Sequence, residues 1–434
     1  MKTYSEYKDS GVQWIGKVPS HWNPCRFKNF ISLINTPSKD DNKIGLENIE
    51  SGTGHFKETD SEFEGNGVQF VEDDIIYGKL RPYLRKVWLA TNKGNAVGDF
   101  FVFRANKSKP SYIHWLMLSD GFTSEANGST YGAKMPRVSS DFILSMRYVL
   151  PPFPEQQAIA SFLDAKTKPI DDIIAKREKQ IELLEEMKSA IISHAVTKGL
   201  NPDAKMKDSG IEWIKTEPQS WETRRIKNVI TLLTDYDANG SFADIAKNVK
   251  VNVGEPYAWM VRATDLANKR YGIVDDNNYC NKETFDFLSK SSLEAGDILI
   301  AKRGDIGKSY EVPKCDCPMT LAPNTYLLKT NKQVISNRFF HYFFMSDYGK
   351  KQLSINNKST TIGAIYKDDV KNLKILLPPM DEQQAIASYL DTETSKIDSR
   401  IAKRRKQIEL LQEYKQALIT AAVTGKIDVR EYNS

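Results

Sequence analysis

Two long stretches of the chain repeat apolar side chains at alternating steps of about three and four residues. The apolar residues of this register are Ile170, Ile174, Ile181, Leu184 and Ile191 in the first stretch and Ile397, Ile401, Ile408, Leu411 and Leu418 in the second. The remaining positions of the register are Arg177 and Lys188 in the first stretch and Arg404 and Lys415 in the second. A spacing near 3.5 residues is typical of a coiled-coil helix, whose narrow apolar seam needs a partner. We therefore predict two long helices, the first and second arms, that pack against each other.

Prolines and glycines mark the ends of both arms. Each arm begins with two adjacent prolines, at 151–152 and at 378–379, which fit the end of the preceding segment directly before a helix. Gly199 and Gly425 stand where each helix should end, because glycine readily adopts the left-handed conformation of a helix C-terminus. We therefore place the arms at 151–199 and 378–434.

The rest of the chain carries shorter apolar runs with a different pattern. Runs rich in β-branched and aromatic residues predict strands at 74–77, 100–103, 297–301 and 325–328. Two further apolar runs predict short buried helices at 111–118 and 337–345. Because these pieces follow the same order in 1–150 and in 200–377, we predict one mixed α/β fold that is used twice, in a first and a second globular domain.

A long internal repeat supports this division. The run KDSGVQWIGKVPSHWNPCRFKN at 8–29 recurs without a gap as KDSGIEWIKTEPQSWETRRIKN at 207–228. The run LPPFPEQQAIASFLD at 150–164 recurs as LPPMDEQQAIASYLD at 377–391, and we call the pairing of positions that this match defines the 150/377 register. The second pair of runs is spaced more widely than the first, which makes the second globular domain the longer one.

Equivalent arms that follow equivalent domains favour an antiparallel arm pair with an approximate two-fold axis. The fold class is then mixed α/β, with two similar globular domains separated by two long antiparallel helices that form a coiled coil. The alternative is that each arm packs on its own globular domain. The repeated tryptophans Trp14, Trp22, Trp213 and Trp221 are interpreted as core residues near the arms, with base stacking as the alternative.

Composition limits the class of protein but does not identify it. Hydrophobic residues make up 40% of the chain and charged residues 27%, as in ordinary globular proteins. No membrane span and no secretory signal is predicted, because long apolar runs are missing. Four cysteines are few for this length and predict a cytoplasmic protein without disulfides. The net charge of +5 is weak support for a nucleic-acid partner, since scatter on a mixed surface explains it as well.

The motifs of several enzyme classes are incomplete in this sequence. A phosphate-binding loop would need a glycine at position 302, where Lys302 stands before the run 304–309. Cys315 and Cys317 have no second Cys/His pair at zinc spacing, and we interpret them as small buried structural residues. Only 201–204 comes near the tetrapeptide of an adenine methyltransferase. We therefore predict a binding protein without catalytic residues, metal site or cofactor of its own.

The strongest cationic segment is 75–98, which contains five lysines and arginines and no acid. Lysine and arginine bind phosphates and, with small polar side chains, read base edges. The candidate contacts of this segment are Tyr77, Lys79, Arg81, Tyr83, Arg85 and Lys86, and their counterparts in the second domain are Lys302, Arg303 and Lys308. The alternative is a solvated hairpin beside the acidic stretch 58–74.

A second candidate segment lies before the last strand of each globular domain. It combines small hydroxyls, a glycine and a lysine, which suit contact with a groove or a phosphate. The candidate residues are Ser129, Thr130, Tyr131, Lys134 and Arg137 in the first domain and Lys358, Thr360 and Thr361 in the second. A plain glycine turn is the alternative interpretation.

The duplicated arrangement resembles the specificity subunits of type I restriction-modification systems. The resemblance rests on SGVQWIGKVPSHW and SGIEWIKTEPQSW before the domains and on the two LPP-x-x-EQQ-x-I-x-x-x-LD runs before the arms. Within the domains, GLENIESGTG at 45–54 and YGKLRPYL at 77–84 are similar to the recognition-domain motifs of that family, and 261–266 and 301–304 occupy the matching places. The resemblance covers nearly the whole chain.

This resemblance implies that each domain reads one half of a split double-stranded DNA target and that the helix pair sets the gap. It also implies two modification subunits, which bring S-adenosylmethionine, and restriction subunits, which bring ATP, magnesium and DNA cleavage. The arms are then the docking surface for the modification subunits, and no membrane is involved. The unequal domains predict an asymmetric bipartite target. The alternative function is a bivalent protein-binding scaffold without a role on DNA.

Overall fold

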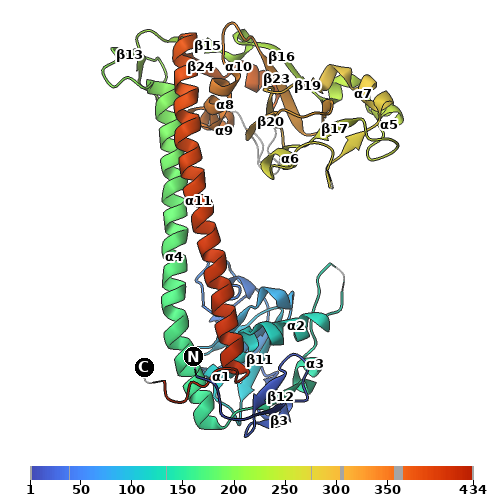
Figure 1. The fold of residues 1–434 in the computed structure, drawn as a ribbon, viewed down its shortest axis with the longest axis vertical. Coiled ribbons are helices and arrows are strands. Elements are labelled where there is room, and N and C mark those ends of the chain that lie inside the picture. Colours follow the sequence, from blue (N-terminus) through green and yellow to red (C-terminus); the bar gives the residue numbers. More distant parts are fainter. Residues whose placement is uncertain are drawn as a thin grey trace. The chain divides into compact units, whose positions relative to one another are not determined.

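The computed structural model describes residues 2–38, 40–132, 134–274, 276–303, 307–355 and 365–432. These residues form two compact units, of which the first contains Met1–Lys179 and Arg404–Ser434 and the second contains Gln180–Lys403. Two long helices, α4 (Phe153–Lys198) and α11 (Met380–Val423), each contribute to both units (Figure 1). Along the described residues, no helix combines the length and the apolar character needed to cross a membrane.

The first unit contains two four-stranded sheets. The first sheet is antiparallel and has the order β4 (Ile31–Ile34), β11 (Phe100–Ala105), β8 (Ile75–Gly78), β9 (Val87–Leu89). The second has the order β5 (Pro37–Ser38), β7 (Gly67–Phe70), β10 (Gly94–Ala96), β6 (Lys43–Ile44), with β10 and β6 parallel. The remaining elements are the strand pairs β1 (Tyr7–Asp9) with β2 (Lys17–Pro19) and β3 (Asn23–Arg26) with β12 (Arg147–Leu150), and the helices α1 (Pro110–Leu118), α2 (Asp120–Gly128) and α3 (Ser140–Ser145).

The second unit repeats this architecture with insertions. Its antiparallel sheet has the order β16 (Ile230–Asp235), β23 (Thr325–Thr330), β20 (Ile298–Ala301), β21 (Ser309–Glu311). The other sheet has the order β18 (Tyr279–Cys280), β17 (Ala258–Val261), β22 (Met319–Leu321), β19 (Ser292–Leu293). The remaining elements are the pairs β13 (Met206–Asp208) with β14 (Thr216–Pro218) and β15 (Glu222–Arg225) with β24 (Lys374–Leu377), and the helices α5 (Phe242–Asn248), α6 (Ala263–Ala267), α7 (Lys282–Phe287), α8 (Asn337–Met345), α9 (Asp347–Ile355) and α10 (Lys367–Asn372).

The predicted elements agree with these sheets and helices. The four predicted strands correspond to β8, β11, β20 and β23, and the two predicted short helices correspond to α1 and α8. The arms are α4 and α11, and each ends at a glycine with positive φ, 76° at Gly199 and 70° at Gly425. The prediction of one mixed α/β fold used twice beside two long helices is therefore confirmed.

The core of each unit contains the start of one arm and the end of the other. In the first unit, Leu163 from the start of α4 and Ile419 and Val423 from the end of α11 belong to the same buried cluster. In the second unit, Leu390 from the start of α11 and Val196 from the end of α4 do the same. Burial of each such aliphatic side chain stabilises the fold by roughly 1.5–3 kcal/mol. The alternative in which each arm packs on its own domain alone is therefore wrong.

The repeated tryptophan before each domain binds the repeated glutamate that begins each arm. The indole Nε1 of Trp22 donates to Glu155 at 3.0 Å, and that of Trp221 donates to Glu382 at 3.0 Å. Both indoles are fully buried, as the sequence predicted. Trp213 is 40% exposed beneath Lys351, so the prediction of a core position is wrong for that residue.

The glutamine after each of these glutamates fixes backbone groups. Gln156 donates to the carbonyl of Pro151 and accepts from the amide of Lys109. Gln383 donates to Pro378 and accepts from the amide of Ser336 in the same way. Because buried backbone groups need partners, this pair of hydrogen bonds explains why the EQQ run recurs at the start of both arms.

Burial along both arms follows the predicted seam. All ten predicted seam positions are buried or partly buried, whereas most positions between them are exposed. In the first unit Lys415 binds Asp171 at 2.7 Å, and in the second unit Lys188 binds Asp398 at 2.7 Å. In the 150/377 register Lys188 pairs with Lys415 and Asp171 with Asp398, so the two copies make the same ion pair. Residue numbers rise along α4 as they fall along α11, which makes the arms antiparallel.

Each unit also holds a histidine at the same position of the helix that follows the main sheet. His114 lies on α1 and His341 on α8, and the two are counterparts in the 150/377 register. Burial lowers the pKa of each imidazole to about 4. His114 is enclosed, whereas His341 is partly open to a cavity. These rings are therefore held neutral by their surroundings.

We predict that the first unit loses stability in mild acid because of His114. Its pKa of about 4 lies below the ordinary value of 6.5, so the folded state binds fewer protons than the unfolded chain. The stabilisation is complete above about pH 6.5 and is lost as the pH falls toward 4, by roughly 2 kcal/mol at pH 5.

The measurement is urea unfolding of the full chain at pH 7 and pH 5. His114→Gln should reduce the difference between the two midpoints, and the exposed His194→Gln should leave it unchanged. An equal difference in wild type and His114→Gln would contradict the assignment.

Candidate nucleic-acid interface

The main candidate segment of the first unit leaves strand β8 and bends sharply twice. Arg81 and Arg85 have positive φ, 51° and 50°, and bracket the short helix η3 (Pro82–Leu84). Such left-handed conformations cost a non-glycine residue about 1 kcal/mol or more each and often occur at functional sites. Arg81 and Tyr83 are exposed, the latter by 51%, so this segment presents a cation and an aromatic ring to solvent.

Two of the predicted contacts in this segment are structural instead. The Tyr77 ring is 2% exposed and packs against Phe103 and Phe122, so it is removed from the candidate surface. The ammonium of Lys86 donates to the backbone carbonyls of Leu46 and Ile49, and burial lowers its pKa. Lys86 thereby connects the 45–54 motif to the candidate segment. Its role is to position these two segments and not to contact a ligand.

The two candidate segments of the first unit, which the sequence separates by about fifty residues, lie side by side. The amide of Arg81 donates to the carbonyl of Pro136, and the amide of Val138 donates to that of Lys79. The carboxylate of Asp99 joins them, because it accepts two hydrogen bonds from Arg137 and lies 3.7 Å from the Lys79 ammonium. Hydrogen bonds from Arg137 lower the pKa of Asp99, so the cluster holds two cations on one anion.

The second candidate segment divides into anchored and exposed residues. The hydroxyls of Ser129 and Thr130 donate to carbonyls at the end of α2, which leaves them the role of helix termination. Tyr131 is 61% exposed, and Lys134 is also exposed. Arg85 of the first segment binds Asp120 at the start of α2. The outward groups of the first unit are therefore Arg81, Tyr83, Tyr131 and Lys134.

The second unit builds the same backbone arrangement around Lys302. Its amide donates to the carbonyl of Asn324, as that of Lys79 donates to Asp99. Its carbonyl accepts from the amide of Ile365, as that of Lys79 accepts from Val138. Each lysine also lies over an aromatic ring on the neighbouring strand, Lys79 over Phe101 and Lys302 over Tyr326. The predicted correspondence between the two lysines thus has a structural basis.

The charges around the second lysine differ from those around the first. Asp235 binds both Lys302 and Lys367, each at 2.9 Å, and Asp237 adds a second carboxylate at 3.2 Å. Burial opposes the charge of Lys302, but the hydrogen bonds from its ammonium to these carboxylates outweigh burial and raise its pKa. Two cations therefore meet two anions, so the cluster is neutral where the first unit has a positive excess. Arg303 beside it is exposed.

Several predicted residues lie elsewhere or outside the described residues. Lys308 lines a cavity of the second unit. Lys358, Thr360 and Thr361 fall within 356–364, and the first glycine of the 304–309 run, Gly304, falls within 304–306, which the structure does not describe. Cys315 and Cys317 are half-buried, with their sulfur atoms 2.9 Å apart. Within the described ranges, no group of three or more His, Cys, Asp or Glu side chains could hold a metal ion.

The sequence reasoning missed the carboxylates that position the cations. Asp99 and Asp235 were not singled out, although an acid directly before the strand 100–103 and another at the end of β16 were visible in the sequence. Asp265 was also missed. Its carboxylate accepts a hydrogen bond from the amide of Arg262, as the side chain of Asn48 accepts one from the amide of Gly45. The segment 261–266 and the 45–54 motif therefore contain the same turn. The match between VRATDL and GLENI was the available signal.

The chain is similar to known proteins over nearly its whole length. The sequence profile of the type I restriction modification DNA specificity domain matches residues 26–183 and 218–410. The type I restriction enzyme MjaVIII specificity subunit of Methanocaldococcus jannaschii is 26% identical over 96% of this chain and 95% of its own length. The EcoBI specificity subunit of Escherichia coli is 22% identical over 83% of this chain and 75% of its own length.

A solved structure shares the fold. It comes from work on the structural basis of complex assembly and conformational transition of the type I R-M system, and it matches with a TM-score of 0.65 at 18% identity. The match covers 94% of this chain and 98% of that chain. At this identity, the likeness establishes the architecture of two domains and two long helices.

We predict that loss of the cations at the strand ends abolishes DNA binding without unfolding. The variant combines Lys79→Ala, Arg81→Ala, Lys302→Ala and Arg303→Ala. Each phosphate contact that is lost should lower the slope of log affinity against log salt by about one. Fluorescence polarisation measures binding, and circular dichroism checks the fold. Alanine at the exposed Lys107 and Lys290 is the matched control, and unchanged affinity of the fourfold variant would overturn the assignment.

Proposed function

The chain belongs to the family of type I restriction-modification DNA specificity proteins, and from this membership we propose that its two globular domains each read one half of an asymmetric, bipartite DNA target. The observation that carries the proposal is the duplicated lysine arrangement. Lys79 and Lys302 have equivalent backbone partners, and each lies over an aromatic ring of the neighbouring strand, so both domains hold a lysine at an equivalent position. Equivalent anchors on repeated domains suit the two halves of one target.

The surroundings of the two anchors support different half-sites. The first domain adds Arg81, Tyr83 and Tyr131, whereas the second adds Arg303 next to a neutralised lysine cluster. Because base identity is read by side chains in the groove and phosphates only set position, different side chains around a shared anchor select different sequences. Half-sites about one helical turn apart would meet both domains from one face of the duplex.

We assign recognition alone to this chain and chemistry to its partners. Methyl transfer from S-adenosylmethionine then belongs to two modification subunits, and ATP- and magnesium-dependent translocation and cleavage belong to restriction subunits. The complex would work on cytoplasmic DNA. This division agrees with the incomplete enzyme motifs of the sequence.

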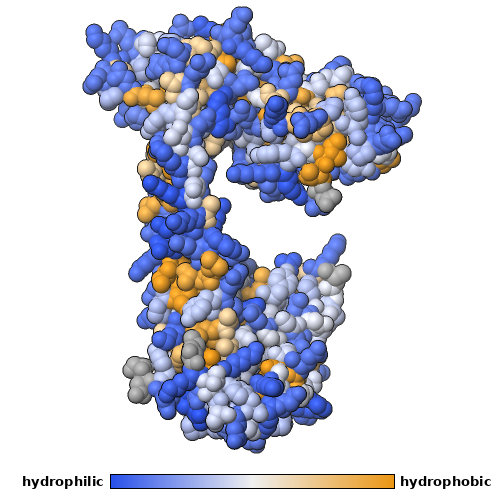
Figure 2. All heavy atoms as spheres, viewed as in Figure 1, coloured by the Kyte–Doolittle hydropathy of each residue, from blue (hydrophilic) through white to orange (hydrophobic). Residues whose placement is uncertain are grey.

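The arms offer each modification subunit an apolar contact. Leu183 and Met187 on α4 are 51% and 48% exposed, and Leu410 and Tyr414 on α11 are 51% and 52% exposed. The two pairs are equivalent in the 150/377 register, and each spans one helical turn. Figure 2 shows apolar atoms, in orange, exposed along the arm helices among hydrophilic ones. Two equivalent patches suit two copies of one partner.

We predict that co-expression with a cognate modification subunit confers adenine methylation at one split sequence. Single-molecule sequencing of the methylome measures it, and the chain expressed alone should give none. The two half-sites should differ in sequence. Methyl transfer by the purified chain alone, or methylation at many unrelated sequences, would count against the proposal.

We predict that charge on the arm patches removes the partner subunits one at a time. Leu183→Glu with Met187→Glu should reduce two bound modification subunits to one, because a buried carboxylate without a partner is costly. Adding Leu410→Glu and Tyr414→Glu should leave none. Native mass spectrometry measures the stoichiometry, and Glu186→Gln on the same helix is the control. Two subunits bound to the fourfold variant would place the docking surface elsewhere.

A further inference from the structure

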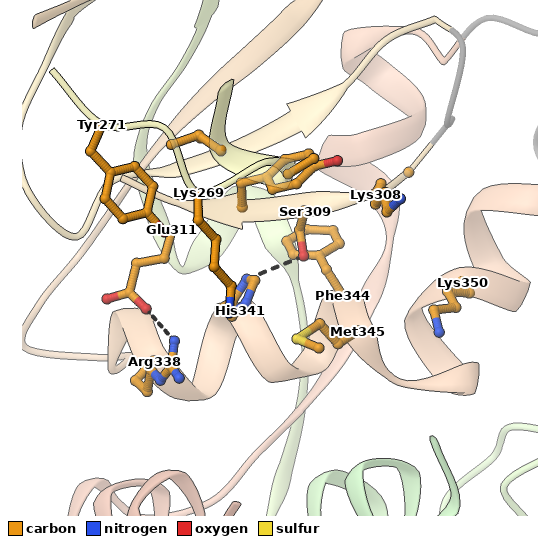
Figure 3. Close-up of a pocket in the computed structure, with 14 residues that line it drawn as sticks. Lys269, Tyr271, Lys308, Ser309, Glu311, Arg338, His341, Phe344, Met345 and Lys350 are labelled. Carbon is orange, nitrogen blue, oxygen red and sulfur yellow. Dashed lines mark hydrogen bonds and ion pairs between the residues drawn. The ribbon is translucent and has the colours of Figure 1, made fainter. Parts of the chain in front are cut away.

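The second unit contains a cavity of about 830 Å³ whose lining includes neither Lys302 nor its partners Asp235, Asp237 and Lys367. Its walls come from α6 and the residues after it, from β21, from α8 and from the start of α9. Figure 3 shows His341 of α8 at its centre, with Lys269 directed toward it from the opposite wall and Lys350 at the far side. The volume is that of a small-molecule binding site.

The charges of the lining residues favour an anion. Lys269, Lys308, Lys350 and Arg338 line the cavity, and Glu311 is the acid among its lining residues. Glu311 is paired with Arg338 at 2.7 Å, and Arg338 also binds Asp391 at 2.6 Å, so the positive charge that the proposal uses is that of Lys269 and Lys350. Among the described residues, no ion pair is found for the ammonium groups of Lys269 and Lys350. Lysine groups gathered around a concave surface focus a positive potential into it.

The uncharged part of the wall favours a flat aromatic ligand. Tyr271, Tyr310, Phe344 and Met345 line the cavity together with the imidazole of His341. The pKa of His341 is about 4 because of burial, and its Nδ1 lies 3.3 Å from the hydroxyl of Ser309, so the ring is a neutral hydrogen-bonding group. Aromatic side chains stack on nucleobases, and neutral polar groups bind base edges.

In the first unit the equivalent histidine is covered by a loop. His114 and Leu118 of α1 are the counterparts of His341 and Met345 in the 150/377 register. There Gly54 lies so close to both side chains that a Cβ on it would collide with them. The cavity is therefore not a requirement of the shared fold, because the same helix position is covered in one copy and open in the other. It is a specific feature of the second domain.

We propose that this cavity binds a single nucleotide, with the base against the aromatic wall and the phosphate on the lysines. The nucleotide is either free or part of the bound DNA, and the second case rests on the proposed function. A recessed site of this kind would give the second domain the positive charge that its neutral strand-end cluster lacks.

Two variants test the proposal in the full chain. Lys269→Gln with Lys350→Gln removes two charges and keeps the side-chain lengths, and Tyr271→Ala removes part of the aromatic wall. Lys290→Ala, an exposed lysine of the same unit outside the cavity, is the control. Calorimetry with each deoxynucleoside monophosphate and with inorganic phosphate forms one arm. Fluorescence polarisation with the duplex target found by methylome mapping forms the other.

If the cavity binds a nucleotide of the DNA, both variants should bind the duplex more weakly than the wild-type chain does. The double glutamine variant should lose about tenfold in affinity and about two units of salt slope, and Tyr271→Ala should lose roughly fivefold or more. If the cavity binds a free nucleotide, a deoxynucleoside monophosphate should saturate the wild-type chain below about 1 mM. The double glutamine variant should lose this binding, and its affinity for the duplex should equal that of the wild type.

Two results would overturn the proposal. One is the lack of saturation by any monophosphate up to about 10 mM together with duplex affinities of both variants equal to wild type. The other is that inorganic phosphate binds as tightly as each nucleotide does. The base would then contribute nothing to binding. If the wild-type chain binds no duplex at all, the proposed function fails, and the nucleotide titration alone decides the cavity.

Discussion

The structure depends on the burial of each arm's two ends in two different hydrophobic cores. Val196 at the end of α4 lies in the core of the second unit, and Val423 at the end of α11 lies in the core of the first. The aliphatic side chains at these ends contribute burial free energy that the isolated globular domains would lack. The ion pairs Lys415–Asp171 and Lys188–Asp398 then select the register of the two helices, because a shifted helix would leave a charge without its partner.

This constraint also explains how the chain ends are used. In the second unit, the chain passes from α4 through Gly199 into the segment that carries Trp221. In the first unit the same place is built from both termini, since Gly425 packs against Pro19 and Trp22 and the amide of Asp428 donates to the carbonyl of Lys2. Residues that follow the second arm therefore pack in the first unit at the place where, in the second unit, the residues that follow the first arm pack.

The sequence predicted the features that repeat and missed those that depend on packing between distant segments. The 150/377 register and the apolar seam were enough to predict the arms, their antiparallel pairing and the shared fold, because both copies carry the same signal. The burial of Tyr77 could not be read from its neighbours, since it is set by contact with Phe122 on the distant helix α2. For the same reason, the carbonyl partners of Lys86 were not visible in its own segment.

The two copies diverge where they would need to recognise different things. The lysine after the central strand keeps its backbone hydrogen bonds in both units, because these bonds belong to the sheet and its closing segment. The carboxylates around it, the loop against the buried histidine and the inserted helices α5 and α7 are free to change, since none of them lies in the core that binds the arms. On the proposed function, anchoring and selectivity would therefore be carried by different residues. On this proposal, a domain could acquire a new target by changing loop side chains and cavity walls, because these residues lie outside the cores that contain the arm ends.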